Sequence, residues 1–177
     1  MNLLAIETST EYLSLAVSRG DAVFDTHLRA GQRQAEIIYT ELRALLAKAG
    51  LEMADLAGIA FGSGPGSFTG VRIACGVTQG LALALNLRVK GVSTLEVLAE
   101  ETHAACGAER VLVCLDARMG EVYHAACTRN AGGDGWMLAE VPAVCRPEDV
   151  PCTEGTGWTG AEAASLPVIS TFEPEQR

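Results

Sequence analysis

The stretch GSGPGSFTG at residues 62–70 is the first candidate for chemistry, because glycine-rich loops often hold phosphate groups. A Walker A loop would need a lysine to reach the phosphates, and no lysine lies between residues 49 and 89. A dinucleotide-binding fingerprint would need a glycine where Ser67 stands, and a nucleophile elbow would need flanking glycines that Ser67 lacks. The pattern therefore favours a structural turn in which Ser67 or Thr69 caps a helix, whose free N–H groups could still attract an anion.

Two acidic residues, Glu7 and Asp116, each end an apolar strand, where carboxylates that handle magnesium or phosphate are often found. Neither is followed by the glycine that lets a backbone approach a phosphate closely, so a satisfied turn is favoured over a ligand site. The three histidines form no H-x-x-x-H or H-E-x-x-H pair, and the six cysteines form no C-x-x-C pair. The sequence thus predicts no metal site and no catalytic residue.

Composition narrows the class of protein further. Thirteen lysines and arginines against 22 aspartates and glutamates give a formal net charge of -9, which argues against an extended nucleic-acid-binding surface. The first ten residues are not those of a signal or transit peptide. The longest apolar stretch, residues 73–87, is interrupted by polar residues and is judged too short to cross a bilayer. We expect a cytoplasmic protein, not bound to a membrane, with reduced cysteines.

Hydrophobic periodicity predicts the elements that must position these residues. In the first part of the chain it indicates strands at 3–8, 12–18, 22–29, 56–61 and 88–92 and helices at 32–49, 68–85 and 93–105. Strands at 110–118, 121–128 and 136–141 follow, and no firm elements are predicted beyond residue 145. Three strands joined by tight turns and then alternating strands and helices predict an α/β fold with a mixed sheet packed by helices.

The second part of the chain repeats the first. LLAIET and VLVCLDA are both apolar strands that end in an acidic residue and lead through a tight turn into an alternating strand. This repeat predicts two related domains, residues 1–106 and residues 107–177, with a boundary near 105–110.

The helix predicted at 68–85 is unusually rich in small residues, among them Gly70, Gly76 and Gly80. A glycine inside a helix costs about 1 kcal/mol relative to alanine, so three of them need a packing reason. Close packing within the domain and a surface for a partner explain them equally well at this point.

Four ordered motifs, FGSGPGSFTGVRI, TQGLALAL, GVSTLEVLA and LDARMGEVY, resemble those of the TsaB (formerly YeaZ) family of bacterial tRNA-modification proteins. The resemblance covers roughly residues 2–128, with an echo in GTGW at 155–158. It implies an actin-like, Hsp70-like ATPase fold of the ribonuclease H-like type, with two related subdomains, of which the second is expected to be shortened at its C-terminal end. It also implies a non-catalytic paralogue of TsaD, the enzyme that transfers a threonylcarbamoyl group to N6 of a tRNA adenosine.

The resemblance further implies partners and an interface. A TsaB protein pairs with TsaD through helices of its first domain, and the nucleotide-binding protein TsaE joins them. This implies ATP or ADP in the complex but no cofactor held tightly by this chain, tRNA contact only through the complex, and a homodimer in isolation. On helices 32–49 and 68–85 the expected interface residues are Tyr39, Arg43, Arg72, Gly76 and Gly80.

Some features of the chain stay without a role at this stage. Family-motif residues to which no role is assigned are Gly64, Pro65, Gly66, Ser67, Asp116, Arg118 and Glu121. Residues 34–36 read Gln-Ala-Glu where many relatives have His-Ser-Glu, so Gln34 receives no role either. The resemblance thus favours a non-catalytic scaffold protein that binds TsaD. Two alternatives to this scaffold remain open: a nucleotide-hydrolysing enzyme or peptidase of the same fold, and a self-associating protein that uses the same helices.

Overall fold

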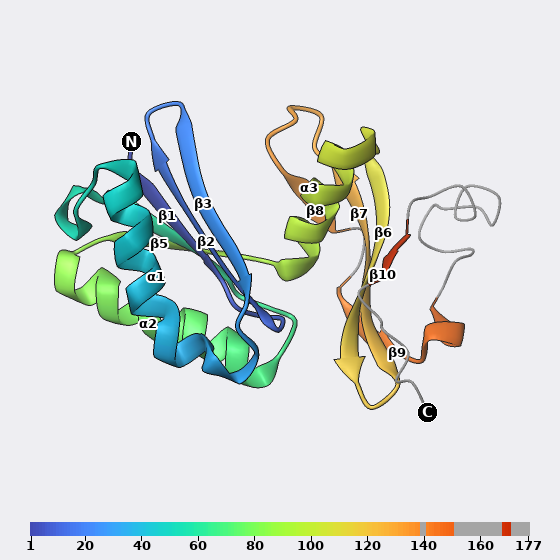
Figure 1. Cartoon of the computed structure of the whole chain (residues 1–177). Coiled ribbons are helices and arrows are strands. Elements are labelled where there is room, and N and C mark those ends of the chain that lie inside the picture. Colours follow the sequence, from blue (N-terminus) through green and yellow to red (C-terminus); the bar gives the residue numbers. More distant parts are fainter. Residues whose placement is uncertain (139–140, 151–167, 171–177) are drawn as a thin grey trace. The chain divides into compact units, whose positions relative to one another are not determined.

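The computed structural model describes residues 1–138, 141–150 and 168–170, which form two compact units, Met1–Ser93 and Thr94–Arg177 (Figure 1). The division falls before the third helix, whereas the sequence placed it after that helix, near residues 105–110. The helix goes with the second unit because its buried residues Leu95 and Ala99 pack against the strands of that unit.

The first unit is built on a five-stranded mixed sheet in the order β3-β2-β1-β4-β5. Its strands are β1 (Leu3–Glu7), β2 (Tyr12–Arg19), β3 (Ala22–Arg29), β4 (Gly58–Gly62) and β5 (Arg88–Val92). The first three form the predicted antiparallel meander, and β4 and β5 run parallel to β1 because each is reached through a helical crossover. The strand predicted at 56–61 begins two residues later than expected and reaches into the glycine-rich stretch.

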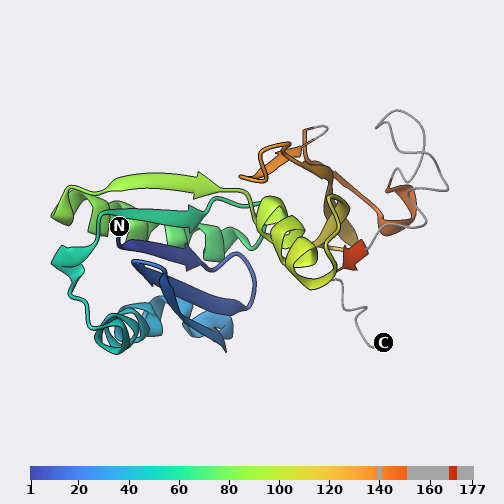
Figure 2. The ribbon, with the colours of Figure 1, turned by 90° about the horizontal axis from the view of Figure 1, so that it is seen from above.

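Two helices cover one face of this sheet (Figure 1, Figure 2). The first is α1 (Gln34–Ala49), which follows a 3-10 turn, η1 (Gly31–Arg33), and ends at Gly50 in the left-handed conformation. A second 3-10 turn, η2 (Met53–Asp55), leads into β4. The second helix is α2 (Phe68–Leu85), with the bounds that the sequence predicted, and Asn86 ends it, also in the left-handed conformation.

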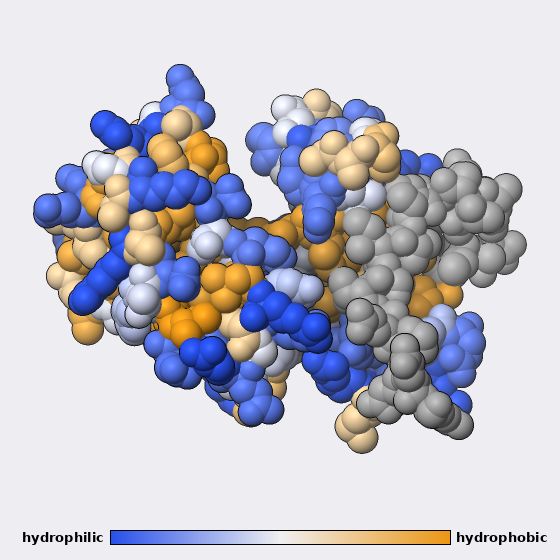
Figure 3. All heavy atoms as spheres, in the orientation of Figure 1, coloured by the Kyte–Doolittle hydropathy of each residue, from blue (hydrophilic) through white to orange (hydrophobic). Residues whose placement is uncertain are grey.

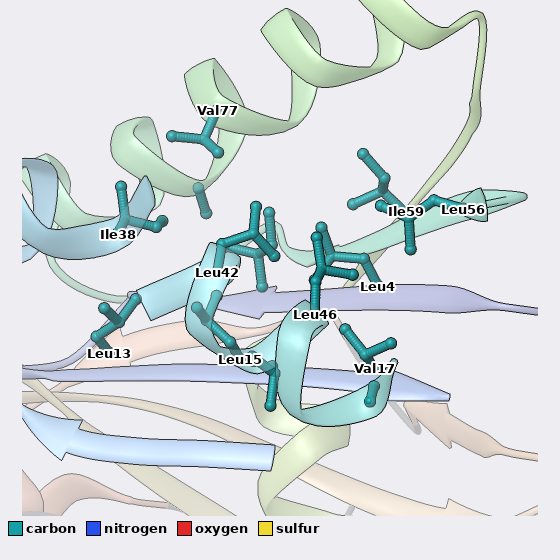
Figure 4. Close-up of a cluster of buried hydrophobic side chains, with 14 residues drawn as sticks. Leu4, Leu13, Leu15, Val17, Ile38, Leu42, Leu46, Leu56, Ile59 and Val77 are labelled. Atoms are coloured by element: carbon teal, nitrogen blue, oxygen red, sulfur yellow. The ribbon is translucent and has the colours of Figure 1, made fainter. Parts of the chain in front are cut away.

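The core of this unit lies between the sheet and the two helices (Figure 4). Alternate residues of the strands, such as Leu4 and Leu15, point to the helices, while Ile38 and Leu42 of α1 and Val77 of α2 point back. The alternation follows from the two-residue period of a strand, and the spacing on α1 follows from the helical turn. This packing fixes which face of each helix is left for solvent or for a partner.

The second unit repeats part of this arrangement. Its sheet has the order β10-β6-β7-β8, with β9 also paired to β7. The elements are α3 (Thr94–Cys106), β6 (Arg110–Arg118), β7 (Glu121–Arg129), β8 (Trp136–Leu138), β9 (Ala143–Cys145), η3 (Pro147–Asp149) and β10 (Val168–Ser170). The strand expected at 136–141 is shorter, and β9 and β10 lie where no strand was predicted.

The two sheets share one pairing scheme, which confirms the predicted α/β fold of two related units. In each, a buried strand with an acidic residue at or near its C-terminal end, Glu7 or Asp116, pairs antiparallel with the next strand: β1 with β2, and β6 with β7. In each, the same buried strand also has a parallel neighbour from later in the unit, β4 or β10. Each sheet is therefore mixed; α1 and α2 pack against the first, and α3 packs against the second.

Candidate functional site

The glycine-rich loop, residues 62–70, lies against the turn that joins β1 to β2. A Cβ atom at Gly62 would overlap the Glu7 carboxylate, and one at Gly70 would overlap the backbone carbonyl of Thr8. At Gly66 it would stand 2.6 Å from the backbone oxygen of Ser9. Three of the four glycines in this stretch thus serve close approach between two segments of the chain itself.

Hydrogen bonds tie this loop and the start of α2 to the same turn. Ser67 N–H donates to the carbonyl oxygen of Ser9 over 2.6 Å, and Thr8 Oγ1 donates to the carbonyl oxygen of Gly70 over 2.7 Å. Ser67 Oγ also accepts the N–H of Gly70 over 3.3 Å, so Ser67 rather than Thr69 is the N-cap residue. These donors are used within the chain, and a carboxylate lies beside them, which supports the structural turn over a phosphate loop.

The outer face of α2 differs sharply from its inner face. Apart from the adjoining backbone of α2 itself, no atom in the described part of the chain lies within 4 Å of a Cβ built at Gly76 or Gly80. The packing that explains Gly70 therefore does not explain these two glycines. Phe68 and Leu83 are 73% and 88% exposed on the same helix, and the guanidinium of Arg72 lies over the Phe68 ring, 3.2 Å from its centroid.

On α1, Tyr39 is 46% exposed and Arg43 is exposed. They are four residues apart and so lie on one side of the helix. The space-filling view shows apolar surface among polar groups in the region of α1 and α2 (Figure 3). All five residues expected at a partner interface are thus exposed, on two helices that contact each other.

Gln34, to which no role was assigned from the sequence, connects α1 to the β1–β2 turn. Its side chain is almost fully buried, and Nε2 donates to the carbonyl oxygens of Thr10 and Tyr12, each over 2.8 Å. Sequence reasoning missed this contact because a buried glutamine gives no periodic signal. Among the described residues no group of three or more His, Cys, Asp or Glu side chains is placed to hold a metal ion.

A Ser–His pair lies on the other face of the sheet. Ser14 Oγ and His27 Nδ1 are 2.7 Å apart, and the His27 ring stacks on Tyr12 with the centroids 4.6 Å apart. The sequence did not reveal the pair because its residues meet only through the β2–β3 register. A hydrolase would also need an acid to orient the imidazole and donors for an oxyanion, and the described contacts of the pair supply neither.

The motif residues of the second unit shape the β6–β7 hairpin. Asp116 Oδ1 accepts the backbone N–H of Arg118 over 2.6 Å, and Oδ2 lies 3.2 Å from Arg118 Nη1. Arg118 and Met119 have φ angles of 69° and 57°, and Glu121 pairs with Arg118 across the turn. Asp116 therefore holds a left-handed turn in place, which is a structural role.

Two cysteines of the second unit, Cys127 and Cys145, have thiols with raised pKa values. Burial raises the pKa of the Cys127 thiol to about 12, and burial likewise raises the pKa of Cys145, with a smaller contribution from nearby carboxylates. A nucleophilic cysteine needs a lowered pKa. Neither thiol is therefore activated, and Cys127 packs in the core of the second unit.

Comparison with known proteins agrees with the fold and the motifs. The family model "TsaD: tRNA N6-adenosine threonylcarbamoyltransferase" matches residues 28–150. The protein "tRNA threonylcarbamoyladenosine biosynthesis protein TsaB" of Escherichia coli (strain K12) is 41% identical over 169 residues, which cover 89% of this chain and 72% of that protein. Its counterpart from Haemophilus influenzae is 36% identical over 173 residues, covering 89% and 73%.

Two solved structures are also similar. YeaZ from Pseudomonas aeruginosa has 42% sequence identity and a TM-score of 0.78, covering 85% of this chain and 70% of that one. A protein described as similar to peptidase YeaZ from Pseudomonas aeruginosa has 37% identity and a TM-score of 0.81, covering 96% and 82%. With this identity over most of both chains, and with the four motifs on the predicted elements, the chain belongs to the TsaB (YeaZ) family.

Proposed function

We propose that this chain is a non-catalytic subunit of the machinery that makes N6-threonylcarbamoyladenosine in tRNA. Its task is to bind a TsaD transferase, together with TsaE, through α1 and α2. The names of the curated relatives and the match to the TsaD family model support a role of this chain in threonylcarbamoyladenosine synthesis. The exposed outer face of α2, with two glycines that nothing in the described chain requires, is the observation that supports the binding role.

The outer face of α2 suits another helix. Glycines without neighbours let a second backbone approach closely, and Phe68 and Leu83 offer apolar surface that water solvates poorly. Arg43 and Arg72 would meet acidic groups of the partner at the edge of this contact. The same features suit a second copy of the chain, so a homodimer in isolation would use the same face.

A membrane is the weaker alternative for this helix. By length and composition alone α2 is long and apolar enough to span a bilayer, with 22% of it buried. Residues 73–87 were expected to be too short to cross a bilayer, but the whole helix is longer and meets the length requirement. However, the core helix of a water-soluble protein passes the same test. The inner face of α2 packs on β4 and β1, and its first turn is bonded to the β1–β2 turn. We therefore keep the prediction of a cytoplasmic protein that binds no membrane.

In this proposal the chemistry belongs to the partners. ATP or ADP is bound in the complex rather than tightly by this chain, and tRNA is contacted through TsaD, which fits the net charge of -9. The enzyme alternatives have one observation in their favour, the Ser14–His27 pair, which lies on an open sheet face. The pair alone is not sufficient for hydrolysis, because its described contacts include no orienting acid and no oxyanion donors, and we do not propose a peptidase.

The first test is complex formation with TsaD from the same organism, followed by size-exclusion chromatography and calorimetry. Gly76→Leu and Gly80→Leu should abolish the heavier peak, because a leucine side chain would hold the partner helix away from α2. The fold should survive, because both positions are open and leucine is a better helix former than glycine by about 1 kcal/mol.

Ala104→Leu, at an exposed position of α3, is the matched control and should leave the complex intact. A complex that persists in both glycine variants would place the interface elsewhere. Unfolding of the two glycine variants would show instead that Gly76 and Gly80 are needed for packing within the chain.

A further inference from the structure

Glu7 ends β1 with its carboxylate enclosed by the chain. Oε1 accepts the backbone N–H of Ser9 over 2.5 Å. Oε2 is shielded from solvent and has no hydrogen-bond partner among the described residues. Gly62 of β4 provides the space for this oxygen, because any Cβ there would overlap it.

This arrangement carries two local costs. A carboxylate oxygen without a partner loses its hydration, and glycine inside a strand is less favourable than a residue with a side chain. Proteins keep such local costs mainly where something else depends on the arrangement. The neighbouring contacts show what depends on it here.

The turn that Glu7 holds is the support on which α2 begins. Thr8 and Ser9 are 0% and 2% exposed, and each bonds to the loop that starts the helix: Ser9 through its carbonyl to Ser67 N–H, and Thr8 through Oγ1 to the Gly70 carbonyl. The close approach of Gly66 and Gly70 to the same turn leaves little room for the helix start to shift.

We propose that Glu7 is a positioning residue for α2. Its carboxylate, seated against Gly62, fixes the β1–β2 turn, and this turn fixes the first turn of the helix. The outer face of α2 therefore takes its orientation from a residue on the far side of the loop. Only the consequence for partner binding rests on the proposed function; the positioning of the helix does not.

Hydrogen exchange of the full chain tests the positioning directly. Glu7→Ala should speed exchange of the Ser67–Val71 amides about tenfold or more, because the turn that holds them loses its hydrogen bond to a charged group. The amides of α1 and of the second unit should keep their rates. Glu7→Gln retains an acceptor at Oε1 and should preserve most of the protection.

A positioning role predicts that Glu7→Ala loses amide protection only at Ser67–Val71 and that Glu7→Gln keeps it. General destabilisation of the fold would not be confined to these amides. Equal acceleration throughout the first unit would overturn the proposal, and so would unchanged exchange at Ser67–Val71.

A second experiment uses the contact between Glu7 and Gly62 and measures stability by urea unfolding instead of hydrogen exchange. Gly62→Ala alone should destabilise the chain, because the added methyl group collides with the carboxylate. The double variant Glu7→Ala/Gly62→Ala should be more stable than the sum of the two single effects. Additive effects would show that the carboxylate does not occupy this space and would overturn the proposal.

Binding to TsaD then separates this inference from the proposed function. We expect Glu7→Ala to weaken the complex several-fold and Glu7→Gln to restore it. If α2 loses protection while binding is unchanged, the positioning role stands and the proposed α2 interface fails. If binding is lost while exchange is unchanged, Glu7 acts on the partner directly, and the positioning role is refuted.

Discussion

At the scale of single residues, the glycines of this chain have different roles that their spacing does not reveal. Gly62, Gly66 and Gly70 make room for the β1–β2 turn, whereas Gly76 and Gly80 have no neighbour in the described chain. The glycines up to the first turn of α2 therefore have a packing role, and the two glycines later in the helix have a proposed binding role.

Alanine substitution should separate these two groups. Gly70→Ala should destabilise the chain by about 1–3 kcal/mol, because its methyl group meets a backbone carbonyl that cannot move freely. Gly76→Ala should stabilise it by about 0.5–1 kcal/mol, because alanine loses less conformational entropy in a helix. Urea unfolding of both variants measures the difference, and equal effects would contradict the assignment.

At the scale of elements, long segments with a clear period were predictable. The bounds of α2 and β6 match the sequence prediction, because a long apolar period with turn residues at its ends leaves few alternatives. The bounds of the short strand β5 match as well. The predicted helix 32–49 loses its first residues to a 3-10 turn. Strands β9 and β10 have three residues each and exist through pairing with β7 and β6, so no local pattern marks them.

One contact that joins elements should make stability depend on pH. The hydrogen bonds from Arg129, over 2.6 Å, and from Trp136, over 2.8 Å, lower the pKa of Glu100 below its ordinary value of 4.5. They link α3 to β7 and β8. A carboxyl with a lowered pKa stabilises the fold above its unfolded pKa, and this contribution is lost as the pH falls through the folded pKa.

Glu100→Gln should therefore be less stable than the parent at pH 7, and the difference should shrink as the pH is lowered below about 4.5. The effect will be small, because the Glu100 side chain is 53% exposed and water screens the pair. Urea midpoints of both proteins across this pH range provide the measurement. A difference that stays constant with pH would exclude the charge as its cause.

At the scale of the whole molecule, the proposed function predicts competition between two assemblies. A second copy and TsaD would use the same face of α2. Light scattering should show the isolated chain gaining mass with concentration, and Gly80→Leu should keep it monomeric. Adding TsaD should replace the homodimer by a complex with one copy of each protein. A stable species with two copies of this chain and TsaD would instead indicate two separate surfaces.

The sequence by itself determined the family, the α/β class and the repeat, because these depend on local period and on motifs within short segments. It also predicted an interface on α1 and α2, which stays a prediction. Only the tertiary structure decided which glycines pack and which stand open, that Glu7 lies against Gly62, that Gln34 bridges to the β1–β2 turn, and that α3 joins the second unit. Each of these depends on contacts between residues far apart in the chain, and no local pattern encodes such contacts.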